Sequence, residues 1–133
     1  MAVARRRIDP ASGKAALIEW AAGAVPPSDA APAVPAAPAV PRSVIATAVR
    51  YSLEEVTARA PGNSVEVRVP PFGVTQCVEG PRHTRGTPPN VIECDAATWL
   101  AMVTGRLSWA DAVGAGRVAA SGLRADLSAL LPL

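Results

Sequence analysis

The sequence is short of the residues that carry most catalytic and metal chemistry. Its 133 residues include one histidine, His83, and two cysteines, Cys77 and Cys94. Two cysteines do not make a disulfide framework, so we expect both to be reduced. Soft ligands are too few for a zinc site, and no phosphate-binding glycine loop or metal-ligand spacing occurs. We therefore expect no metal and no cofactor.

Excess charge and long apolar runs are also scarce. The formal net charge is +2, and the tightest basic run, Arg5–Arg7, lies at a terminus, so a nucleic-acid partner is not indicated. A basic run alone is also not a stable membrane anchor. The apolar stretch Ala15–Val25 contains Glu19 and lacks the long uncharged run that the apolar region of a signal peptide or a membrane span requires. We expect a cytoplasmic protein with no stable membrane insertion.

Large side chains are few as well. Half of the residues count as hydrophobic, but only 4% are aromatic, and much of the apolar content is alanine. The length is that of one domain, so the few large apolar groups should be concentrated in a single core.

The N-terminal part predicts a short helix followed by a linker. Asp9-Pro10 is a typical helix start, and the helix should run from Ala11 to about Ala22. The segment that follows, up to Pro41, contains six prolines, which remove backbone donors and fix φ. We divide the chain into an N-terminal arm and helix (1–24), a Pro/Ala-rich linker (25–41) and a main domain (42–133). A Pro-rich recognition peptide is the alternative for the linker.

The main domain predicts an α+β fold. A helix should start at Ser43 or Thr47 and run to about Arg59. Alternating or β-rich segments then predict strands at Ser64–Val69, Gly73–Val78 and Val91–Cys94. A loop from Glu79 to Asn90 separates the last two. Helices packed on such a sheet make an α+β domain.

The last third, from Asp95 to Leu133, is punctuated by glycines. Asp95 should cap a helix that ends near Gly105, and Ser108 should cap a short second helix closed by Gly114 and Gly116. A short strand is expected at Arg117–Ala120. After Gly122, leucines at helical spacing predict a terminal helix: Leu123, Leu127, Leu130 and Leu131.

An ordered series of residues in this third carries a family resemblance. The series is Trp99, Gly105, Leu107, Ser108, Ala112, Gly116, Val118, Gly122, Asp126, Leu127, Leu130 and Leu131. It resembles the C-terminal half of the sterol carrier protein 2 (SCP2) family, above all its stand-alone bacterial orthologues, from about Pro41 onward. The resemblance implies an SCP2-like fold with a mainly antiparallel curved sheet covered by helices.

The resemblance also implies a function, namely non-enzymatic carriage of a fatty acid, acyl-CoA or other lipid in an apolar tunnel. Carried onto this chain, the lining residues would be Trp99, Met102, Val103, Leu107, Trp109, Val113, Leu123, Leu127 and Leu130. The alternative is that these residues fill the core and that the domain is a scaffold for a homodimer or an unidentified protein partner. The ending Leu131-Pro132-Leu133 is not a Ser-Lys-Leu-type address, so a peroxisomal role does not carry over.

Polar candidates gather in the loop before the third strand. Arg82, His83 and Arg85 could grip a carboxylate or phosphate head group. Alternatively, the arginines pair with nearby surface acids and His83 only packs. Catalysis at His83 would need a nucleophile and an orienting group, and no complete constellation is present. We therefore predict that the protein is not an enzyme.

Overall fold

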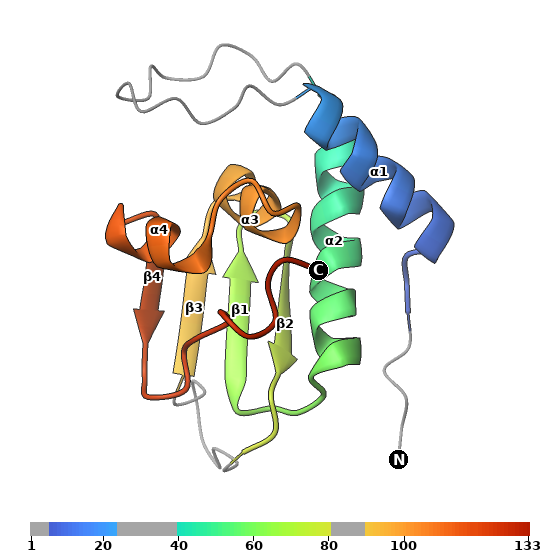
Figure 1. The fold of residues 1–133 in the computed structure, drawn as a ribbon. Helices are drawn as coiled ribbons and strands as arrows, with labels where there is room; N and C mark the ends of the chain where they lie inside the picture. Colours follow the sequence, from blue (N-terminus) through green and yellow to red (C-terminus); the bar gives the residue numbers. More distant parts are fainter. Residues whose placement is uncertain (1–5, 24–39, 81–89) are drawn as a thin grey trace.

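The structure is a computed structural model that describes residues 6–23, 40–80 and 90–133. Within these three ranges the fold has four helices and four strands (Figure 1). Their order and bounds are α1 (Pro10–Gly23), α2 (Arg42–Arg59), β1 (Val65–Val69), β2 (Gly73–Cys77), β3 (Asn90–Cys94), α3 (Ala96–Val103), α4 (Trp109–Gly114) and β4 (Val118–Ser121). Each of these elements was predicted from the sequence to within a few residues.

The strands form one sheet in the order β2-β1-β3-β4. The outer pairs, β1–β2 and β3–β4, are antiparallel, whereas the central pair, β1–β3, is parallel. This mixed sheet with its helices confirms the α+β class and is consistent with an SCP2-like fold. The sheet is uncurled, which departs from the curved sheet that the resemblance implies.

One face of the sheet is buried because side chains alternate along each strand. Val65, Val67 and Val69 of β1 are completely buried, as is Ile92 of β3. The residues between them on β1 are polar and only partly buried. In Figure 1, α2 stands beside β2, α1 lies outside α2, and α3 follows directly from the end of β3.

A buried hydrogen bond links the two helices of the core. The Trp99 indole Nε1 of α3 donates to Ser52 Oγ of α2 at 2.8 Å, and both side chains are fully buried. The Ser52 hydroxyl lies 2.7 Å from the Ala48 carbonyl oxygen, to which it can donate. The bond fixes how α3 lies against α2, since a buried indole N–H needs a partner.

The predicted caps of α3 and α4 are confirmed. Asp95 Oδ1 accepts from the Thr98 N–H at 2.7 Å, and Ser108 Oγ accepts from the Asp111 N–H at 3.1 Å. Gly105, after α3, has φ of 79°, a conformation that glycine adopts without strain.

The prediction of a terminal helix after Gly122 is wrong. The segment from Gly122 to Leu133, called the C-terminal segment below, contains turns and irregular backbone only. Asp126 Oδ1 accepts from the Ser128 N–H at 2.8 Å, a local bond that competes with helix formation. Leucines at helical spacing therefore pack without a helix.

Replacing Ser52 with Ala should leave the Trp99 N–H buried without an acceptor. We expect a loss of about 1–3 kcal/mol in the free energy of unfolding, measured by urea denaturation. Ser43→Ala, the same change at an exposed position of α2, is the control and should have a much smaller effect. Equal stabilities for the two variants would contradict the role given to Ser52.

Candidate functional site

The residues expected to line an apolar tunnel divide into three groups. Trp99, Met102, Val103 and Leu127 are buried to 2% exposure or less and belong to the central core. Leu107, Trp109 and Leu130 are partly buried and pack against it. By contrast, Val113 is 41% exposed and Leu123 is fully exposed, so neither lies in the interior. The structure thus brings together the α3 residues and Leu127 in a dense core.

The C-terminal segment covers this core with leucines. Leu127 is fully buried, and Leu130, Leu131 and Leu133 pack against the core cluster. The Leu133 N–H donates to the Val103 carbonyl at the end of α3, at 3.1 Å. The core around α3 is therefore closed on this side by a segment without helix or strand.

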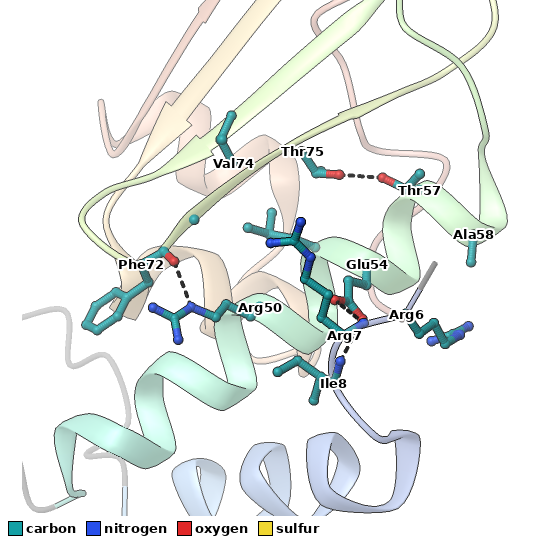
Figure 2. Close-up of a pocket in the computed structure, with 12 residues that line it drawn as sticks. Arg6, Arg7, Ile8, Arg50, Glu54, Thr57, Ala58, Phe72, Val74 and Thr75 are labelled. Atoms are coloured by element: carbon teal, nitrogen blue, oxygen red, sulfur yellow. Dashed lines mark hydrogen bonds between the residues drawn. The ribbon is translucent and has the colours of Figure 1, made fainter. Parts of the chain in front are cut away.

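A separate hollow of about 490 Å³ lies between the N-terminal arm, α2 and β2, and Figure 2 shows its lining residues. Its walls come from residues 6–8, from the α2 face that carries Arg50, and from β2 with the preceding Phe72. None of the nine residues expected to line a tunnel borders it.

Hydrogen bonds hold the walls of this hollow. The Glu54 carboxylate accepts from the backbone N–H groups of Arg7 and Ile8, at 2.9 and 3.2 Å, and so fixes the arm on α2. The Arg50 Nε donates to the Phe72 carbonyl at 3.0 Å. Thr57 Oγ1 donates to the Gln76 carbonyl at 2.8 Å. Two side chains of α2 thus bind the outer edge of β2.

Sequence reasoning missed Arg7 and Arg50 as site residues. Arg7 belongs to the terminal basic run Arg5–Arg7, for which no binding role was indicated, and Arg50 lies within α2. Only the docking of α1 on α2 brings the two to one hollow. The sequence signal for this docking was Gly13 of α1. A Cβ at this position would overlap the Tyr51 ring of α2, so the close approach of the two helices requires glycine.

The possible head-group residues Arg82, His83 and Arg85 lie outside the described residues. Within the ranges 6–23, 40–80 and 90–133, no group of three or more His, Cys, Asp or Glu side chains could hold a metal ion. In those same ranges no helix is long and apolar enough to cross a membrane.

A family model described as bacterial SCP ortholog matches residues 41–133, which is well over half of the chain. The chain belongs to the bacterial SCP ortholog family. This membership confirms the resemblance to sterol carrier proteins. No curated protein matches the chain.

As a member of this family, the chain contains a domain of the lipid-carrier type. The match begins at Pro41, so α1 and the arm with Arg6–Ile8 precede the family region. The core under the C-terminal segment lies inside that region, whereas the hollow is built from both parts.

Both cysteines of the bacterial SCP ortholog are buried thiols. Burial raises the pKa of Cys77 to about 11 and, with nearby Asp95 and Glu93, that of Cys94 to about 12. Because the thiolate is the reactive form, both should be inert in the folded protein. We expect negligible labelling by iodoacetamide at pH 8 and full labelling in denaturant. Rapid labelling of the folded protein would contradict their burial.

The arm should detach more easily in acid. The hydrogen bond from Arg6, the main cause, lowers the pKa of Glu55 below 4.5, with a further contribution from Arg59. A carboxylate whose pKa is lower in the folded state stabilises the fold at pH values above its unfolded-state pKa. This stabilisation is lost as the pH falls through the folded-state pKa. Arg6→Ala should therefore lower Tm slightly at pH 7 and have no effect once Glu55 is protonated. A Tm difference that persists in acid would contradict the pairing.

Proposed function

We propose that this bacterial SCP ortholog is a non-enzymatic carrier that binds the acyl chain of a fatty acid, acyl-CoA or other lipid against α3. In the lipid-bound state, the acyl chain takes the place of leucines of the C-terminal segment. The observation that carries the proposal is the cover on α3, which is a run of leucines without helix or strand.

The exchange replaces one apolar contact with another. The C-terminal leucines and an acyl chain present similar hydrocarbon surface to the core cluster, and the flexible Met102 in that cluster can adapt its shape. The backbone bond that must open is the one from Leu133 to Val103. Once released, both of its groups can bind water, so that step strands no buried polar group.

The balance of free energies sets the length of the ligand. Exposing a buried leucine costs about 1.5–3 kcal/mol, and each buried methylene returns about 0.8 kcal/mol. Several methylenes are therefore needed for each leucine displaced. The ligand must be a long acyl chain, because a short one cannot displace the segment.

The dense core supports a second candidate function. Trp99, Leu100 and Met102 are at most 1% exposed, and the Trp99 N–H is bonded, so the interior is well filled. A filled domain of this family could serve as a scaffold for a homodimer or another protein partner. Carriage predicts saturable lipid binding, whereas a scaffold does not.

Titration with dansyl-labelled undecanoic acid tests the carrier function. We expect saturable binding with energy transfer from the tryptophans, and tighter binding when Leu131 and Leu133 are both replaced by Ala. Weakening the cover raises the fraction of binding-competent protein and lowers the apparent Kd by the same factor. With about 0.8 kcal/mol per methylene, two such truncations should tighten binding about tenfold or more.

Leu123→Ala is the matched control, because Leu123 is in the same segment but fully exposed. It should leave the apparent Kd unchanged. Met102→Glu, which puts a charge under the cover, should abolish binding. Absence of saturable binding to the wild-type protein would leave the scaffold as the function.

A further inference from the structure

The hollow beside the N-terminal arm has the walls of a binding site and is separate from the core under α3. Its apolar walls include Ile8 of the arm, Leu53 of α2 and Phe72 before β2. Its volume of about 490 Å³ is within the range of small-molecule sites. The arm residues lie outside the family region, so this wall is an addition to the family domain.

Two arginines, Arg7 and Arg50, line this hollow. In Figure 2 the Arg7 side chain extends from the arm across the hollow toward β2, while Arg6 points away. Arg50 is anchored by its Nε on the Phe72 carbonyl, and its guanidinium lies beside Phe72 at the edge of the hollow (Figure 2). Within the described part of the chain, the Arg7 guanidinium has no ion pair.

Glu54 is the acidic residue among those that line the hollow, and its carboxylate does not pair directly with Arg7 or Arg50. Both oxygens of Glu54 accept backbone N–H groups of the arm. Arg6 forms its ion pair with Glu55, which is not a lining residue. Arg7 and Arg50 against Glu54 leave an excess of one positive charge inside the hollow.

The edge of β2 adds a backbone donor between the arginines. In an antiparallel strand, the backbone groups of alternate residues point away from the partner strand. The carbonyls of Phe72 and Gln76 point outward, since Arg50 and Thr57 donate to them. Val74 lies two residues from each of them along the strand, so its backbone groups also point away from β1. Its N–H is therefore directed outward, toward the hollow that Val74 lines.

These features select the charge and shape of the ligand. A carboxylate can accept two parallel bonds from a guanidinium and a further bond from a backbone N–H. A single excess positive charge matches a monoanion, whereas a phosphate monoester carries about −1.5 to −2 at pH 7. The apolar walls favour a hydrocarbon body attached to the anion.

We propose that this hollow is a binding site for a small monocarboxylate with a compact apolar body. Arg7, Arg50 and the Val74 N–H hold the carboxylate, and Ile8, Leu53 and Phe72 hold the apolar body. The site depends on the N-terminal arm and does not rest on lipid binding at the core.

Phenylacetate is a suitable probe, and its binding can be followed by amide chemical shifts in ¹H–¹⁵N spectra of the full chain. We expect saturable shifts at Val74 and Thr75 and none at Val103 or Leu133. Arg7→Ala should weaken binding about tenfold or more, because it removes a charge-assisted bond. Phenylacetamide, which has the same shape without the charge, should bind at least tenfold more weakly.

Arg117→Ala is the matched control, because it makes the same change in net charge as Arg7→Ala. Arg117 is exposed and lies between α4 and β4. It should leave the Kd of phenylacetate unchanged. A second variant, Arg50→Ala, should weaken binding as Arg7→Ala does. Equal effects of Arg7→Ala and Arg117→Ala, or the absence of saturable shifts at Val74, would overturn the proposal.

Failure here is distinguishable from failure of the carrier function. Arg7→Ala should not change the Kd of the dansyl-labelled acid for the core. The double variant Leu131→Ala/Leu133→Ala should not change the phenylacetate shifts at Val74. Phenylacetate shifts that move to Val103 and Leu133 would place the probe at the core and overturn the second site.

Discussion

The fold depends on the buried hydrogen bond from the Trp99 indole to Ser52. A fully buried tryptophan contributes the largest apolar surface of this core, but its N–H must find an acceptor. Ser52 offers that acceptor from the buried side of α2. This contact fixes α3 against α2, and α3 in turn presents Met102 and Val103 to the core under the C-terminal segment. The proposed carrier function therefore depends on a structural hydrogen bond.

Local signals in the sequence were sufficient for most elements. The side chains of Asp95 and Ser108 cap the two helices that follow them, and the alternation of Val65 to Val69 marks β1. These features need only near neighbours to form. The parallel pairing of β1 with β3 is a long-range property, and the pattern of apolar residues does not encode it.

The candidate site was less predictable, for two physical reasons. Leucines at helical spacing predicted a final helix, but three of them, Leu127, Leu130 and Leu131, pack on the core from irregular backbone, where local side-chain bonds such as that of Asp126 compete with a helix. Arg7 looks like a solvated terminal charge until α1 docks on α2, with Gly13 against Tyr51. The family resemblance did indicate Trp99, Met102 and Val103, which lie together in the core, and whether they bind lipid stays a proposal.

Hydrogen exchange at the C-terminal segment tests the central claim most directly. The Leu133 amide is bonded to the Val103 carbonyl and is protected only while the segment covers α3. If an acyl chain displaces the segment, saturating palmitate should speed exchange at Leu133 and at Leu131, while the Val67 amide in β1 stays protected. Bound palmitate with unchanged or slower exchange at Leu133 would contradict the account.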